Sequence, residues 1–289
     1  MVMFLLVFGA YPLIELARMA FAAVTIRDGQ FHWSSAGFSN FSAAFDDTVF
    51  LTSLYNSGVF VVATTVLTLV LGVVLAVLTD RATQRGGSIA AAARNVLIWP
   101  AIIAPVVVSV VWLLVLSPHV GALNKLLASI GLPEQGWLGS GLGAMASIIY
   151  VDVWHWTPVV YLLVYTALKD MDPEVYEAAC IDGASDAQLF WHVTLPLLRP
   201  VLAVAAGIRV VMGVKAFDEM FLLTHGGPGT ATTVLSIHIR GVFFDEMRLG
   251  YGAALSLIVV AFVVVGFLLI VAARRVVRAV RQARWKVIP

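Results

Sequence analysis

The sequence contains few charged residues and a single cysteine. Only 12% of its 289 residues are charged, whereas 61% are hydrophobic and the mean hydropathy is +0.95. Soluble domains are roughly 45–50% apolar, so the composition excludes an ordinary soluble domain and indicates an integral membrane protein. The net charge of +1 gives no basis for binding a nucleic acid. Cys180 has no second cysteine with which to pair, which excludes an internal disulfide.

Several motifs that carry chemistry are also missing. There is no Gly-x-x-x-x-Gly-Lys-Ser/Thr phosphate loop, so this chain is not expected to bind or hydrolyse ATP by that route. There is no His-Glu-x-x-His, no Cys/His cluster and no Gly-x-Ser-x-Gly elbow. The histidines are scattered, and we interpret them as hydrogen-bonded structural residues: His155, His192, His225 and His238. We therefore expect no catalytic residue, no metal and no cofactor on this chain.

What the sequence does contain is a series of hydrophobic runs. A membrane-spanning helix needs about 20 apolar residues, and six segments meet that length. They lie near 1–24, 54–79, 95–117, 142–168, 200–224 and 251–273. The first lacks a positively charged leader, so we interpret it as a retained span rather than a cleaved signal. These segments predict an all-α membrane protein with one domain, 1–289, a core over 54–273 and a basic tail, 274–289.

The basic residues are distributed unevenly between the two sides of the membrane. One side carries eleven Lys and Arg residues and the other carries four. Lys and Arg are enriched in cytoplasmic loops. This asymmetry places both termini and the loop 169–199 in the cytoplasm, and the tail is most simply an anchor to anionic headgroups.

The loop 169–199 is a polar island in this apolar chain. Pro173 can open a helix, and Glu174 and Glu177 favour its positive N-terminal end. Asp182-Gly183 is a turn signal that ends the helix. Small side chains next to a carboxylate suit insertion into a groove of another protein. The loop therefore predicts a short docking helix.

The pattern in this loop resembles the EAA loop of ATP-binding-cassette importer permeases. The matching residues are Glu177, Ala178, Ala179, Asp182, Gly183, Ala184, Phe190, Leu195, Pro196 and Pro200. The resemblance implies that the loop enters a cleft of an ATPase subunit and transmits its motion to the membrane helices.

A second group of residues is similar to sugar permeases of the maltose type. It comprises Phe217-Asp218, Leu223-Thr224 and Gly226-Gly227-Pro228. The resemblance implies a six-helix, type I importer permease fold in the plasma membrane of a prokaryote. It also implies a second permease subunit, an extracytoplasmic sugar-binding protein, and two ATPase subunits that hold ATP and Mg²⁺. By alternating access the assembly would import a sugar, for example a disaccharide such as trehalose or maltose.

Ionisable and aromatic residues inside the spans are the candidates for a substrate pathway. A charge at the bilayer centre costs roughly 2.5–3.5 kcal/mol unless it is paired or faces water. Two groups of such residues lie in the predicted spans: Asp152 with His155, and Arg209 with Lys215, Asp218 and Glu219. A sugar needs polar partners beside aromatic platforms, and this set supplies them: Trp112, Asp152, Trp156, Lys215, Asp218 and Glu219. In the alternative interpretation, Lys215 only pairs with Asp218 or Glu219 and the tryptophans only pack.

Two other functions stay open from the sequence. An importer for another cargo, such as glycerol phosphate, would share the coupling loop but should place several cations in its cavity, where only Arg209 and Lys215 are candidates. A lipid-linked glycosyl transferase would need clusters of acidic residues or histidines at the membrane surface, and Asp245-Glu246 alone is too little.

Overall fold

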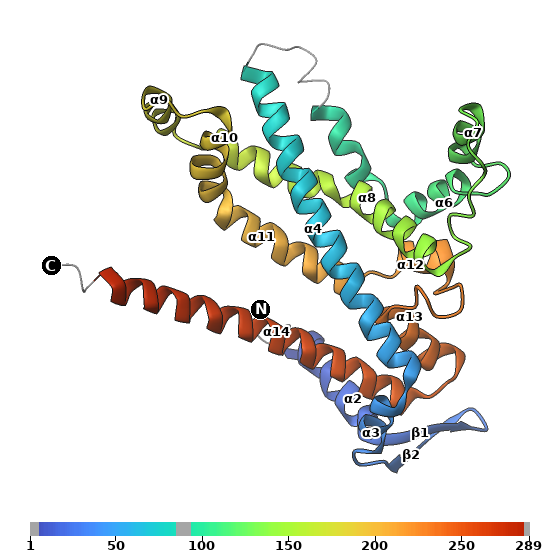
Figure 1. Ribbon diagram of the computed structural model, residues 1–289. Coiled ribbons are helices and arrows are strands. Elements are labelled where there is room, and N and C mark those ends of the chain that lie inside the picture. Colours follow the sequence, from blue (N-terminus) through green and yellow to red (C-terminus); the bar gives the residue numbers. More distant parts are fainter. Residues whose placement is uncertain (1–5, 85–93, 286–289) are drawn as a thin grey trace. The chain divides into compact units, whose positions relative to one another are not determined.

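The computed structural model describes residues 6–84 and 94–285, which form two compact units. One unit comprises 1–51 with 238–289, and the other comprises 52–237. Apart from one two-stranded hairpin, the regular elements of the described residues are helices. The predicted all-α architecture is confirmed (Figure 1).

The first unit joins the two ends of the chain. It contains the short π-helices η1 (Leu6–Ala10) and η4 (Gly241–Asp245), α2 (Tyr11–Ala20), β1 (Ala22–Arg27), β2 (Gln30–Ser35), α3 (Ser39–Asp46) and α14 (Leu249–Trp285). The antiparallel hairpin β1–β2 follows α2 directly. Buried Ala20 packs with Ala253 and Ala254, because small side chains let α2 and α14 approach closely.

The predicted first span, 1–24, extends too far. Helical structure ends at Ala20 and β1 begins at Ala22, which fits the change to a β-branched and polar composition after Ala23. Residues 1–5 of this predicted span lie outside the described residues.

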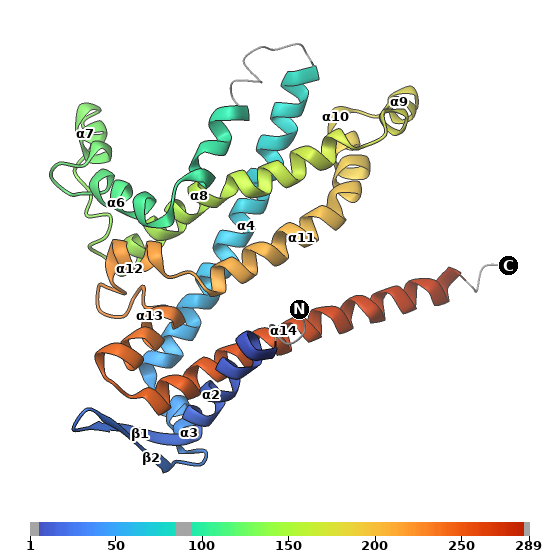
Figure 2. The ribbon, with the colours of Figure 1, turned by 180° about the vertical axis from the view of Figure 1, so that it is seen from behind.

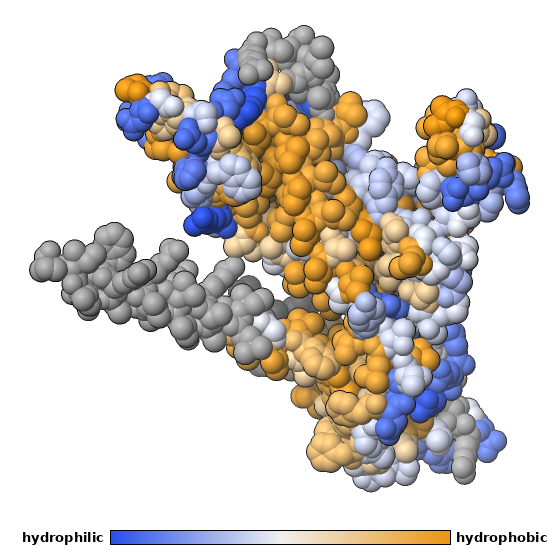
Figure 3. Space-filling model, viewed as in Figure 1, coloured by the Kyte–Doolittle hydropathy of each residue, from blue (hydrophilic) through white to orange (hydrophobic). Residues whose placement is uncertain are grey.

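Four helices of the described residues are long and apolar enough to cross a bilayer. They are α4 (Thr48–Gln84), α8 (Gly141–Lys169), the segment Asp186–Val214, and the Leu249–Gly266 part of α14. They coincide with the predicted spans 54–79 and 142–168, with residues 251–266 of the predicted span 251–273, and with residues 200–214 of the predicted span 200–224. In Figure 3, apolar side chains gather over α4, where Val62, Val66 and Val70 are exposed, as expected for a surface that meets lipid or another subunit.

The third predicted span, 95–117, is not one continuous helix. It consists of a helical segment, Arg94–Ile102, and α6 (Pro105–Val115), which meet at an angle of 103°. Pro105 has no N–H for a helical hydrogen bond, and the residue before a proline is pushed out of the helical region. Ala104 accordingly has extended backbone angles, φ −64° and ψ 140°.

The fifth predicted span, 200–224, is also divided. α11 (Leu195–Val214) begins five residues earlier, with Pro196 in its first turn, and it ends before Lys215. A separate short helix, α12 (Asp218–Thr224), then begins with two acidic residues in its first turn.

α8 is the central helix of the second unit (Figures 1 and 2). One apolar cluster joins it to α4, α6 and α12 through buried residues such as Phe60, Val108, Ile148 and Met220. A second cluster joins it to α4 and α11 and includes Val160 and Leu198. The remaining elements are η2 (Trp99–Ile102), α7 (Ala122–Ser129), α9 (Pro173–Ile181), α10 (Asp186–Gln188), η3 (Leu189–Thr194) and α13 (Leu235–Arg240).

Candidate functional site

The predicted docking helix is present as α9, and local signals define both of its ends. The Asp172 carboxylate accepts a hydrogen bond from the Glu174 N–H at 3.0 Å, and Pro173 occupies the first turn. At the other end, the N–H of Gly183 donates to Cys180 O at 3.0 Å and the N–H of Ala184 donates to Ala179 O at 3.1 Å. This pair of bonds is a Schellman motif, and Gly183 has the positive φ of +77° that the motif requires.

The outer surface of α9 is uncovered by the described residues. None of its residues is buried, and Glu177, Ala178 and Cys180 are exposed. Ile181 is 86% exposed and Val175 is 44% exposed. Apolar side chains exposed beside a carboxylate are typical of a surface that binds another protein.

The inner side of this segment is held by polar and aromatic contacts. The Tyr176 hydroxyl lies 3.1 Å from Thr194 Oγ1, which ties α9 to η3. Ser185 and Gln188 form a capping box that starts α10. Half-buried Phe190 packs against the apolar cluster shared by α4, α8 and α11. The segment is therefore continuous, through packed contacts, with α8 and α11.

Two ion pairs tie the neighbouring helix ends to this segment. Lys169 Nζ at the end of α8 lies 2.6 Å from Asp80 Oδ1 on α4, and Arg81 Nη1 lies 3.3 Å from Asp186 Oδ2 on α10. The two views agree that α9 and α10 lie at the same end of this unit as the C-terminal end of α4 (Figures 1 and 2). Together with the packing of Phe190, these ion pairs connect the α9–α10 segment to α4, α8 and α11.

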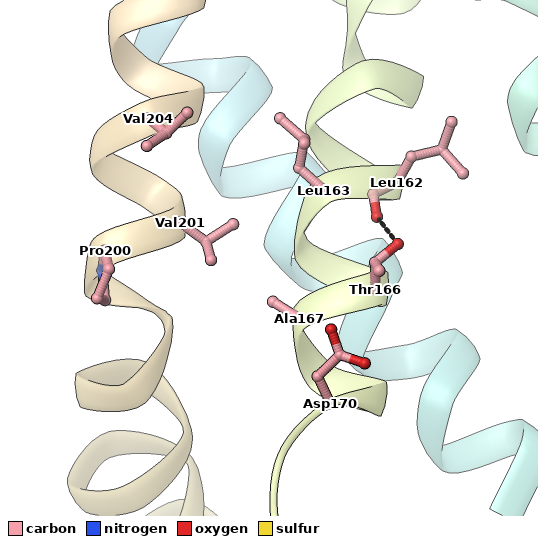
Figure 4. Close-up of a pocket in the computed structure, with 8 residues that line it drawn as sticks. All are labelled: Leu162, Leu163, Thr166, Ala167, Asp170, Pro200, Val201 and Val204. Atoms are coloured by element: carbon pink, nitrogen blue, oxygen red, sulfur yellow. Dashed lines mark hydrogen bonds between the residues drawn. The ribbon is translucent and has the colours of Figure 1, made fainter.

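An apolar groove of about 490 Å³ runs between α8 and α11 close to this end. Figure 4 shows its lining: Leu162, Leu163, Thr166, Ala167, Asp170, Pro200, Val201 and Val204. The Thr166 hydroxyl donates a hydrogen bond to Leu162 O on its own helix at 2.8 Å. Asp170 is the one ionisable residue of the lining. The groove holds none of the predicted pathway residues and no pair of groups suited to acid–base chemistry.

A buried polar cluster lies at the centre of the second unit instead. Arg209 on α11 is ion-paired with Asp152 on α8, and their side chains are 1% and 2% exposed. His155 Nδ1 on α8 lies 2.6 Å from Glu219 Oε1 on α12. The Trp156 ring lies against His155 with a centroid separation of 4.5 Å. Three of the six predicted pathway residues, Asp152, Trp156 and Glu219, are thus brought together.

The other three predicted residues lie apart from this cluster. Lys215 and Asp218 are exposed at the break between α11 and α12, and neither has an ion pair with a described residue. The alternative pairing of Lys215 with Glu219 is wrong, because Glu219 pairs with His155. Trp112 makes edge-on ring contacts with Tyr150 and Trp154, at 5.3 and 5.5 Å between centroids.

The sequence-based pathway set omitted Arg209 and His155. His155 lies three residues after Asp152 and thus on the same helical side, which was a usable signal. No comparable signal links Arg209 to Asp152, because the two residues are 57 positions apart. Within the described residues no group of three or more His, Cys, Asp or Glu side chains is placed to hold a metal ion.

Comparison with known proteins identifies the family. Residues 68–282 match the family described as the binding-protein-dependent transport system inner membrane component. The chain belongs to this family. The match covers the second half of α4, the later long helices and the loop 169–199.

Two relatives and a solved structure support this assignment. The chain is 38% identical over 170 residues to the probable ABC transporter permease protein y4oQ of Sinorhizobium fredii, covering 59% of this chain and 55% of that protein. It is 36% identical over 173 residues to the trehalose/maltose transport system permease protein MalF of Thermococcus litoralis, covering 60% of this chain and 57% of that one. The matches thus span just over half the length of these two relatives.

The fold has a close counterpart among solved structures. A bacterial ABC transporter involved in the import of the acidic polysaccharide alginate superimposes with a TM-score of 0.79 and 25% identity, over 94% of this chain and 92% of the other. The predicted type I importer permease fold is confirmed.

Proposed function

We propose that this chain is a membrane permease subunit of an ATP-driven, binding-protein-dependent importer that moves a sugar into the cytoplasm. The observation that carries the proposal is the coupling segment. It combines the family's motif residues, an uncovered helix α9, and packed contacts that lead into α8 and α11. The chain is then a transport subunit rather than an enzyme.

The proposal includes the partners that the coupling segment requires. Two ATPase subunits, which hold ATP and Mg²⁺, would bind α9 on the cytoplasmic side, where both termini also lie. A second permease subunit and an extracytoplasmic sugar-binding protein would complete the assembly in the inner membrane. Closure of the ATPase subunits would push α9 and switch the cavity between its two orientations, and each state would be favoured by the partner that binds it better.

The buried cluster supplies groups that suit a sugar. Among the described residues, Arg209 Nε and Nη1 are buried and have no hydrogen-bond partner. These two donors, the Asp152 carboxylate and the Trp156 ring provide hydroxyl partners beside an apolar platform. We propose that they contact cargo when the cavity opens, with Glu219 behind them and Trp112, Lys215 and Asp218 along the route.

The charge of the cluster favours a neutral cargo over glycerol phosphate. Arg209 is already compensated by Asp152, so the cluster offers a phosphate no net positive charge. The similarity to MalF, a trehalose/maltose transport system permease protein, supports a disaccharide. We therefore propose trehalose or maltose first and glycerol phosphate as the alternative.

Charge reversal on α9 tests the coupling role. Glu177→Lys in the full assembly should leave the protein in the membrane but reduce ATP-driven uptake by at least about tenfold, because like charges facing each other across an interface cost several kcal/mol. Glu174→Lys is the matched control, since Glu174 is exposed on the same helix but outside the motif. Uptake of radiolabelled trehalose, maltose and sn-glycerol 3-phosphate into proteoliposomes is the measurement. Normal uptake in Glu177→Lys would refute the coupling role. Uptake of sn-glycerol 3-phosphate by the parent assembly, without uptake of trehalose or maltose, would refute the proposed sugar cargo.

A further inference from the structure

The break in the third span leaves a backbone carbonyl that a side chain satisfies. Where a helix is interrupted at membrane depth, the freed backbone groups need partners from the protein. Ile103 lies in the break between η2 and α6, and its carbonyl oxygen is 3.0 Å from His155 Nε2. α8 therefore holds the break in place through one imidazole.

This contact determines how many protons the neighbouring pair carries. A carbonyl oxygen only accepts hydrogen bonds, so His155 Nε2 must carry a hydrogen. His155 Nδ1 and Glu219 Oε1 are 2.6 Å apart, and a hydrogen bond between them requires one proton. That proton makes either an imidazolium with a carboxylate or a neutral imidazole with a carboxylic acid. In both forms the pair is electrically neutral overall.

The charged groups around the pair are few. Asp152 on α8 and Arg209 on α11 compensate each other, and Glu219 is the ionisable residue that α12 buries. The residues from Trp99 to Val115 include no ionisable side chain. Lys215 and Asp218, at the start of α12, are exposed. Without the shared proton, the His155–Glu219 pair would carry a negative charge that no other residue of this cluster compensates.

We propose that His155 and Glu219 are positioning residues that join the break at Ile103 to α12 through a single shared proton. With the proton present, the chain of contacts runs from Ile103 O through the imidazole to α12. Without that proton two acceptors would face each other, and the contact between the two side chains would be lost. α12 then loosens from α6 and α8. The proposal concerns the same cluster as the proposed cargo route, but it does not depend on the cargo.

A buried thiol can report this loosening. Ser109 on α6 is 0% exposed, and the chain's one natural cysteine, exposed Cys180, can be replaced. In a Cys180→Ser, Ser109→Cys protein, assembled with its partners in lipid nanodiscs without cargo or ATP, we would measure the rate of N-ethylmaleimide labelling. Cargo and ATP are absent, so a failure of the proposed uptake function would not affect the result.

The variants separate positioning from simple packing. Glu219→Ala should label roughly tenfold faster at neutral pH, because it removes a buried hydrogen bond to an ionisable partner. Glu219→Gln should stay protected, because its amide N–H can donate to Nδ1 while Nε2–H still donates to Ile103 O. Glu219→Leu, which fills a similar volume but cannot form a hydrogen bond, should label faster than Glu219→Gln.

Two results would overturn the proposal. The first is equally fast labelling in Glu219→Gln and Glu219→Leu, since a hydrogen-bond donor facing Nδ1 would then contribute nothing beyond packing. The second is slow labelling in Glu219→Ala, which would show that the pair does not position α12. If Glu219→Ala does not assemble, the comparison of Glu219→Leu with Glu219→Gln still decides the question.

Discussion

Removing one member of the Asp152–Arg209 pair should be far more damaging than removing both. The two side chains are 2% and 1% exposed. Arg209 Nε and Nη1 already lack hydrogen-bond partners among the described residues, so Asp152 is the main compensation for the guanidinium. Breaking a buried ion pair costs about 3–5 kcal/mol, whereas replacing both members with apolar residues is often neutral. Asp152→Leu should therefore lower stability by that amount, and Asp152→Leu with Arg209→Met should recover most of it.

The assay is thermal unfolding of the purified assembly in nanodiscs, followed by tryptophan fluorescence. We expect the parent and the double variant to have similar, high melting temperatures and both single variants to have lower ones. Asp186→Ala is the control, because its pair with Arg81 is exposed and should contribute less than about 1 kcal/mol. A double variant as unstable as the sum of its single variants would refute the reasoning, since the two charges would then be independent.

Two further predictions concern packing and pH. Gly72→Ala should destabilise α4 against α8 by about 1–3 kcal/mol, because the added Cβ would lie 2.6 Å from Val160 Cγ1. Gly58→Ala on the same helix has nothing within 4 Å and should be neutral or stabilising in the same melt; equal losses in both would contradict this. Burial raises the pKa of Asp47, but hydrogen bonds from the Phe50 N–H, the Tyr251 hydroxyl and the Val49 N–H, with the charge of His238, outweigh it, so the net pKa is lowered. The stability that this gives is present above the normal pKa of about 3.9 and is lost as the pH falls through the lowered value. Melting between about pH 5 and pH 3 should show a loss in the parent that Asp47→Asn lacks, and parallel curves would disprove it.

Local sequence signals predicted the helix in the loop 169–199 well. Pro173, Asp182 and Gly183 act on the backbone within a few residues of themselves, so the start and the end of α9 follow from the sequence. Hydropathy likewise predicted α4 and α8, because about 20 apolar residues suffice to define a span. It failed for 95–117, since averaging over a window hides the effect of Pro105 on the backbone before it.

Composition and motif thus indicated by themselves a membrane permease with a short helix in the loop 169–199. The tertiary structure decided which ionisable residues meet. The sequence left a pairing of Glu219 with Lys215, four residues away, open as an alternative, yet the partner of Glu219 is His155, 64 positions away in the chain. Asp152 and Arg209 come together only because α8 and α11 pack side by side. A helical period gives the face on which a charge lies, but the packing of helices decides which charge lies opposite it.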